Sequence, residues 1–495
     1  MLASRRLQVP PAFLVPPLDG IGGLRAVAGR AEERHTALHD TEQLDLTRWR
    51  ARIEHDPAYG WRVELPPVGE VPGAIHRVAG GPTMPDTLAE RLWCLTDGRP
   101  LRRLVQLDIR AEVTLLLDDT PEEPVVALAD EEVSVSDDDR LLARFRELVL
   151  RPGSGATGDL LDVVEAALLD AGATRLASGP SRFTEVFGRR AAAPPEIPDA
   201  DTEPVGRPMA WVVARRLQAV VHRLVLAESH LRIGDDLAAL ASWHDDLCRL
   251  RAELAVWEPW LGPAVRDLRA PLTSLIDAVA PVRELAEVER AIAAATLRDV
   301  PDGGRGELAA EIAAELRAGR QRVEELLTSA DTADLLGRLR RLGIAPPVRT
   351  EAAEVDPREV VRTTAATGFA TLVSDVAEAD VDTTSTSREE LVDRLIVLAD
   401  VGQHLDGKPA RRFVRRARRY RRGLARRRRH GAAIAWLHAR GSRPDRSSAS
   451  AFLAGRLAGV EERNLQEAQG RTRRAWDRWT TPKGQRWIAE EPDRR

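Results

Sequence analysis

Hydrophobic and polar residues alternate along the first part of the chain, from about residue 34 to residue 150. Successive side chains of a strand point to opposite faces of its sheet, so this period of two predicts half-buried antiparallel strands. The clearest run is 107–117, where charged or polar residues separate the apolar ones. Further runs of this kind are 48–53, 61–65, 125–135 and 144–150, and a helix is expected at about 159–171.

The period changes after residues 191–206, AAAPPEIPDADTEPVG, whose proline and acidic content is typical of a linker. Beyond it the apolar residues recur at helical spacing. The first predicted helices are 211–231, 236–257, 264–295, 307–327 and 331–342. A break at Pro346 and Pro347 separates them from a second group of helices at 357–487.

These patterns predict an α+β multidomain protein. An N-terminal antiparallel β-tunnel or barrel with flanking helices is expected over residues 1–190, followed by the linker at 191–206. An all-α helical-bundle domain is expected over 207–490, in two pseudo-symmetric halves, 207–345 and 350–490. The length of 495 residues also favours more than one hydrophobic core.

The two cysteines, Cys94 and Cys248, are far apart and lie in apolar segments, which predicts buried thiols rather than a disulfide framework or a zinc site. The N-terminus has no secretory apolar region, and no apolar run is long enough to cross a membrane. We therefore expect a cytoplasmic protein with no membrane partner. The motif GSGATG at 153–158 matches a dinucleotide fingerprint, but the strand before it alternates instead of being continuously apolar, so a plain loop is expected.

The most unusual segment extends from Lys408 to His430 and holds twelve Arg and one Lys among 23 residues, with no acidic residue. Removing these 13 from the 73 basic residues of the chain leaves 60 against 77 acidic residues. If the segment is a helix, Phe413 and Tyr420 lie on its apolar stripe with Ala417 and Leu424, and its other faces are cationic. Such a surface attracts polyanions, although a solvated helix face is the simpler interpretation of a charge run.

Several segments resemble a CYTH domain of the triphosphate tunnel metalloenzyme type, followed by a CHAD domain. The resemblance to CYTH rests on LQVPPAFLVPPLDG, HDTEQLDL, the run at 61–66, ALADEEVSV and SRFTEVFG at 181–188. The resemblance to CHAD rests on RLRAELAVWEPWL, LRAGRQRVEELL, GAAIAWL and AFLAGRLAGVEERNLQEAQGRTRRAW. Together these segments cover nearly the whole chain, although each match is short.

The CYTH resemblance implies a tunnel in which inward Arg and Lys hold a triphosphate and carboxylates hold divalent cations. The family's first-strand Glu-x-Glu-x-Lys would fall on Leu2, Ser4 and Arg6, so both carboxylates that a magnesium ion needs are missing. Glu64 and Asp108 stand where the family has bases. Four acidic residues lie at or near family acidic positions: Asp40, Asp130, Glu131 and Glu147. The remaining candidate tunnel cations are Arg48, Arg50, Arg52 and Arg110.

The CHAD resemblance implies two helical bundles with a basic surface linked to inorganic polyphosphate. Family His and Arg positions fall on Ala241 and His244, and apolar residues replace bases in the helix at 389–405. The positive charge has moved to the Arg-rich segment. The candidate polyanion contacts there are Arg411, Arg412, Arg415, Arg416, Arg418, Arg419, Arg422, Arg426, Arg427 and Arg429, with Arg249 and Arg251 from the first half.

We therefore expect a protein that binds inorganic polyphosphate or a similar polyanion, with a CYTH-like domain that has no catalytic residue, metal or cofactor. One alternative is an active, magnesium-dependent inorganic triphosphatase. Another is an RNA-binding or protein-docking module that uses the Arg-rich helix. Nucleic acid is less favoured because Phe413 and Tyr420 fall on the apolar stripe, where they cannot stack on bases.

Overall fold

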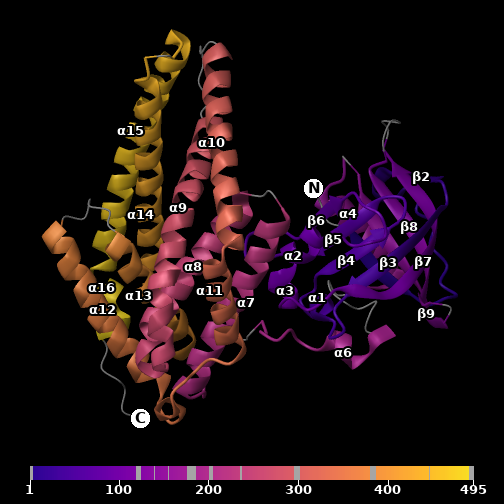
Figure 1. Ribbon diagram of the computed structural model, residues 1–495, viewed down its shortest axis with the longest axis horizontal. Coiled ribbons are helices and arrows are strands. Elements are labelled where there is room, and N and C mark those ends of the chain that lie inside the picture. Colours follow the sequence, from indigo (N-terminus) through magenta and orange to yellow (C-terminus); the bar gives the residue numbers. More distant parts are fainter. Residues whose placement is uncertain are drawn as a thin grey trace. The chain divides into compact units, whose positions relative to one another are not determined.

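The computed structural model describes residues 4–118, 124–138, 140–153, 155–175, 186–199, 204–234, 237–294, 302–379, 386–444 and 446–489. The chain forms two compact units, the first comprising residues 1–195 with 232–234 and the second 196–231 with 235–495. A large antiparallel sheet makes up most of the first unit, and the second is helical (Figure 1). The predicted α+β fold class is confirmed. No helix in the described ranges is long and apolar enough to span a membrane.

The sheet of the first unit has the strand order β10-β1-β9-β8-β7-β3-β4-β5-β6, with β2 pairing to β7, and its pairings are antiparallel. The strands are β1 (Arg5–Val9), β2 (Arg25–Ala28), β3 (Glu32–Asp40), β4 (Arg52–Asp56), β5 (Gly60–Leu65), β6 (Ala74–Val78), β7 (Arg102–Leu117), β8 (Val126–Asp137), β9 (Arg140–Pro152) and β10 (Thr174–Arg175). The helices of this unit include α1 (Asp45–Arg48), α2 (Asp86–Arg91), α3 (Trp93–Thr96), α4 (Gly158–Asp170) and α6 (Arg189–Ala192).

The prediction of one strand over 48–53 is wrong, because the carboxylate of Asp40 holds residues 45–48 in a short helix. Asp40 is 1% exposed and accepts backbone N–H groups from Leu46 and Thr47, both at 2.9 Å. These bonds satisfy the first free N–H groups of α1, as a helix cap does. Arg48 therefore ends a helix, Arg50 has a left-handed φ of 59°, and strand β4 starts only at Arg52.

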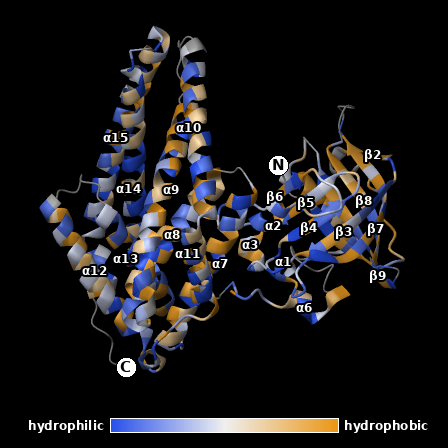
Figure 2. Ribbon diagram, viewed as in Figure 1, coloured by the Kyte–Doolittle hydropathy of each residue, from blue (hydrophilic) through white to orange (hydrophobic). Residues whose placement is uncertain are grey.

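Helix α4 covers the outer face of strands β1, β8 and β9. Its N-terminus is capped by Thr157, whose side chain accepts a hydrogen bond from the backbone N–H of Leu160. Three apolar residues spaced along α4 pack on buried leucines and valines of the strands: Leu161, Val164 and Leu168. The alternation of the strands sends their other side chains to the inner face. Figure 2 shows both hydrophobic and hydrophilic residues along the strands.

On the outer face of β3 to β5, the Trp61 side chain is buried between two histidines. The Trp61 ring lies 4.8 Å from the rings of His39 and His55, measured between centroids, and all three side chains are buried. Burial lowers the pKa of His39, although its hydrogen bond to the Ala37 carbonyl opposes the shift. The folded state therefore keeps His39 neutral at pH values where an unfolded chain would protonate it.

The His39 environment predicts a loss of stability in mild acid. Because the folded pKa lies below the unfolded value near 6.5, the unfolded state binds more protons as the pH falls below that value. The thermal midpoint of the wild type should therefore fall more between pH 7.5 and 5.5 than that of His39→Phe. Equal falls for the two proteins would contradict this assignment.

The second unit contains α7 (Met209–Ile233), α8 (Leu237–Trp257), α9 (Arg266–Ala294), α10 (Asp302–Thr328), α11 (Ala330–Ile344), α12 (Pro357–Ala379), α13 (Thr386–Leu405), α14 (Lys408–Gly441), α15 (Ser448–Trp479) and α16 (Pro482–Ala489). Helix α14 packs against α13 and α15 and also touches α9 and α16. Its apolar residues enter an aromatic core, where Phe413 and Tyr420 are fully buried against Trp479. The two cysteines are unbridged, Cys94 buried and Cys248 half-buried. The pseudo-symmetry of two halves stays a prediction.

Gly423 allows the close approach of α14 to α15. A Cβ atom at this position would lie 2.5 Å from Thr472 Oγ1 and 3.1 Å from Thr472 Cβ, and Thr472 is fully buried. Gly431, on the same helix, has nothing within 4 Å of the corresponding point. The two glycines therefore separate the effect of crowding from that of helix propensity.

Gly423→Ala should lower the thermal midpoint because α15 must shift away, at a cost of about 1–3 kcal/mol. Gly431→Ala, the matched control, should raise it, since alanine in an open helix position is favoured by up to about 1 kcal/mol. Thermal unfolding followed by circular dichroism tests both variants. An equal rise for the two variants would show that the helices do not pack this closely.

Candidate functional site

One side of α14 carries a row of exposed basic residues without acidic partners. The α14 stripe, as we name it, consists of Lys408, Arg411, Arg415, Arg419, Arg422 and Arg426. Their spacing of three or four residues places them on one side of the helix, and all six are exposed. None forms an ion pair with a carboxylate of the described part of the chain. At 1.5 Å per residue, the stripe runs for roughly 27 Å.

The positive potential of this region affects a neighbouring arginine. Arg416 is half-buried beside the stripe and donates a hydrogen bond of 2.9 Å to the carbonyl oxygen of Lys483. Burial lowers the pKa of Arg416, and the charges of Arg412 and Arg415 lower it further.

A different side of α14 is neutralised by carboxylates of α13. Arg418 donates to Asp400 at 2.5 Å, and Arg421 contacts Asp393 at 2.8 Å and Glu389 at 3.1 Å. Arg428 also pairs with Glu389. Burial opposes the ionisation of Arg421, but the two acidic neighbours outweigh it and raise its pKa. This side of the helix is held by ion pairs inside the bundle.

The predicted polyanion contacts differ in exposure and in pairing. Arg411, Arg412, Arg415, Arg419, Arg422 and Arg426 are exposed, and Arg418 is exposed but paired. Arg416 and Arg429 are half-buried, the latter 3.8 Å from Glu287, and Arg427 is buried. The two predicted contacts outside the Arg-rich segment are also neutralised by carboxylates of α13. Arg249 pairs with Asp400 at 3.2 Å, and Arg251 pairs with Glu390 at 3.1 Å. Lys408 completes the stripe, although sequence reasoning did not select it.

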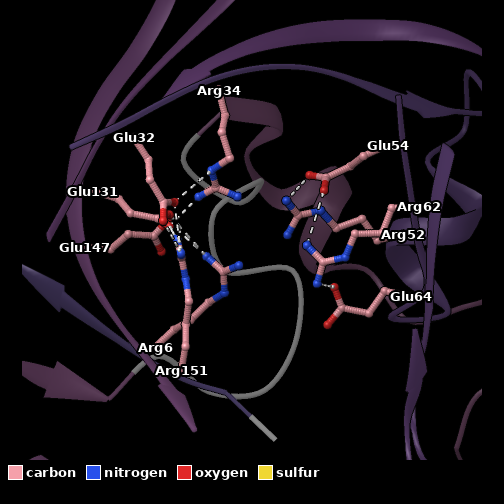
Figure 3. A network of polar contacts seen from close by, with 10 residues as sticks. All are labelled: Arg6, Glu32, Arg34, Arg52, Glu54, Arg62, Glu64, Glu131, Glu147 and Arg151. Atoms are coloured by element: carbon pink, nitrogen blue, oxygen red, sulfur yellow. Dashed lines mark hydrogen bonds and ion pairs between the residues drawn. The ribbon is translucent and has the colours of Figure 1, made fainter. Parts of the chain in front are cut away.

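The inner face of the sheet carries a second group of charged residues, shown in Figure 3. Five arginines meet five glutamates there: Arg6, Arg34, Arg52, Arg62 and Arg151 with Glu32, Glu54, Glu64, Glu131 and Glu147. They come from β1, β3, β4, β5, β8 and β9, at alternate positions that point to the same face. Arginine and glutamate residues are equal in number in this network.

Of the predicted tunnel cations, only Arg52 lies in this network. Arg48 donates to the carbonyl oxygen of Pro194 from the end of α1, and Arg50 is exposed in the following turn. Arg110 is 79% exposed on the other face of β7, 3.4 Å from Glu33. The network also holds three arginines that sequence reasoning missed, Arg34, Arg62 and Arg151, and two of them carry a signal in the sequence. Arg34 and Arg62 each stand two residues from a glutamate, Glu32 and Glu64, on the same face of a strand. Arg151 has no such neighbour, and only the fold brings it to Glu32.

The four acidic residues at or near CYTH-family positions do not all lie on the inner face of the sheet. Asp40 caps α1, and Asp130 pairs with Arg146 at 2.6 Å outside the network. Glu131 and Glu147 face each other across β8 and β9 on the inner face. Ser4 is exposed, and Leu2 and residues 181–185 lie outside the described ranges. In the part of the chain that the structure describes, no group of three or more His, Cys, Asp or Glu side chains is arranged to hold a metal ion.

Glu147 is fully buried, and its pKa is raised by this environment to about 7. Burial is the main cause, Glu131 adds to it, and Arg6, whose guanidinium lies 3.4 Å away, opposes it. The folded state therefore binds a proton that the unfolded chain releases near pH 4.5. Stability is lost as the pH rises between these values.

Glu147→Gln should remove this loss. Relative to wild type, the variant should gain about 2 kcal/mol more stability at pH 8.5 than at pH 5.5, because only the wild type must ionise the buried group. Glu112→Gln, on the exposed outer face of β7, is the control and should gain nothing. Denaturant unfolding at the two pH values measures the difference, and a pH-independent effect of Glu147→Gln would refute the shifted pKa.

Comparison with protein-family models finds no matching family, and no curated protein matches the sequence. Among solved structures, PptA from Streptomyces chartreusis is 19% identical with a TM-score of 0.40, covering 55% of this chain and 99% of that one. The CHAD domain from the plant Ricinus communis is 15% identical with a TM-score of 0.37, covering 59% and 94%. These similarities are too distant to support an argument about activity. A large antiparallel sheet followed by a helical unit is the architecture that a CYTH and CHAD pairing predicts.

Proposed function

We propose that the helical unit is CHAD-like and binds an extended polyanion, inorganic polyphosphate in the first place, along the α14 stripe. The observation that carries the proposal is the row of six exposed basic residues that have no acidic partner in the described part of the chain. Holding so many like charges on one helix costs stability through repulsion at i, i+4. A bound polyanion relieves this repulsion and releases its own counterions.

The shape of the stripe favours a linear ligand over a compact one. The basic residues follow the helix axis for roughly 27 Å, whereas the carboxylates of α13 neutralise the neighbouring side. A compact anion would reach only two or three guanidinium groups. A chain of phosphates laid along the axis reaches the five guanidinium groups and the ammonium group of Lys408, and arginine binds phosphate oxygens in a bidentate fashion.

Polyphosphate is favoured over RNA because the stripe offers charge without a stacking surface. Phe413 and Tyr420, the aromatic residues of the Arg-rich segment, are fully buried in the core. Proteins that bind single-stranded nucleic acid normally add aromatic or base-reading contacts to such charge. The protein-docking alternative is weakened for the paired side of α14, where this chain's own carboxylates already serve as partners.

We propose further that the CYTH-like unit is not an active triphosphatase. Each of the five arginines of the inner network is already paired with at least one glutamate, so these internal pairs would have to be broken before the guanidinium groups could hold a triphosphate. Phosphate release from inorganic triphosphate with magnesium ions tests the alternative. Activity that Arg52→Gln abolishes would overturn the proposal for this unit alone.

The binding prediction compares two triple variants by fluorescence anisotropy of labelled long-chain polyphosphate across a salt series. Arg411, Arg415 and Arg419 are changed to Gln in one. The control changes Arg317, Arg322 and Arg341 to Gln, three exposed arginines of α10 and α11 that lack a carboxylate partner in the described ranges. The stripe variant should lose affinity at least tenfold and lower the salt slope by about two units, because three phosphate contacts are lost.

The control variant should bind as the wild type does. Equal losses in both variants would mean that only overall charge matters, and the stripe would not be a site. Unlabelled RNA serves as a competitor in the same assay. Displacement by RNA at concentrations no higher than those of polyphosphate would favour the nucleic-acid alternative.

A further inference from the structure

The arginines of the inner network do not simply alternate with glutamates; they converge on two of them. Glu131 and Glu54 are 1% and 5% exposed, and each receives guanidinium groups from more than one strand. We propose that Glu54 and Glu131 act as internal ligands that close the tunnel to anions, occupying the positions that a compact oxyanion would otherwise take.

Glu131 is the focus of three arginines on one side of the tunnel. One carboxylate oxygen, Oε1, accepts from Arg34 at 2.5 Å and from Arg151 at 2.9 Å, and the other lies 3.8 Å from Arg6. Arg34 comes from β3, Arg151 from β9 and Arg6 from β1. Three cations gathered from three strands around one buried acceptor have the geometry of an anion site (Figure 3).

Glu54 is the focus on the other side. It pairs with Arg52 two residues before it on β4, and its second oxygen lies 3.9 Å from Arg62 on β5. Burial opposes the ionisation of Glu54, but the attraction of Arg52 and Arg62 is stronger and lowers its pKa. Glu54 is therefore charged at neutral pH.

The chemistry of the two foci defines what could replace them. Guanidinium groups in a partly buried site favour a small oxyanion that accepts several charge-assisted hydrogen bonds, such as inorganic phosphate or pyrophosphate. While the carboxylates are in place, such an anion would meet a negative charge and no unsatisfied cation. Removing one carboxylate takes a negative charge away from two or three arginines, and the excess of positive charge that remains favours another anion in its place.

The experiment measures pyrophosphate binding by titration calorimetry in variants of the full chain. Every protein carries Arg411→Gln, Arg415→Gln and Arg419→Gln, so that binding on α14 does not contribute and the two proposals are tested separately. Glu54→Gln and Glu131→Gln keep the side-chain size but remove the charge. The matched control is Glu33→Gln, at a 68% exposed carboxylate that faces Arg110 outside the network.

Each of Glu54→Gln and Glu131→Gln should bind pyrophosphate at least tenfold more tightly than the parent, and Glu33→Gln should not differ from it. Pyrophosphate should also raise the thermal midpoint of the two variants alone. Binding by the parent as tight as by the variants would show that the tunnel is already open. Folded variants that do not bind would show that the glutamates are structural only. If Glu131→Gln does not fold, Glu54→Gln decides the outcome.

Discussion

The pairing of guanidinium with carboxylate groups is the interaction on which both units depend. A charge removed from water is tolerated only with a partner and further hydrogen bonds, and breaking one partner of such a pair costs several kcal/mol. In the first unit this requirement determines the inner face of the sheet, where Glu131 and Glu54 collect the arginines of several strands. In the second it joins α8 and α14 to α13, since Asp400 accepts from both Arg249 and Arg418.

The α14 stripe is informative because it departs from this constraint. The same helix contributes Phe413 and Tyr420 to an aromatic core, and Arg421 and Arg428 to ion pairs with Glu389. The packing of these two sides leaves one further side, which is exposed and only basic. Burial, hydrogen bonding and internal pairing thus account for half of the twelve arginines of the segment, and the exposed, unpaired half is what a partner would recognise.

Period and composition predicted much of this fold. Alternation identified the long strand β7, and the change to helical spacing identified the all-α unit. The failures have local physical causes. Arg48 and Arg50 fit an alternating pattern, yet the buried carboxylate of Asp40 organises a helix there through bonds to Leu46 and Thr47. Arg110 alternates correctly, but it lies on the outer face, and one residue decides between the two faces of a strand.

The sequence by itself determined the order of a sheet unit and a helical unit, the helical nature of the Arg-rich segment and the burial of Phe413 and Tyr420, because periodicity and side-chain polarity act locally. Only the tertiary structure decided which arginines have partners. Arg418 and Arg419 are adjacent in sequence, and only Arg418 pairs with a carboxylate of the described chain, Asp400. Such pairing depends on helices and strands brought together from distant parts of the chain. An ion pair forms only where two charges lie within a few ångströms of each other, whatever their separation in sequence.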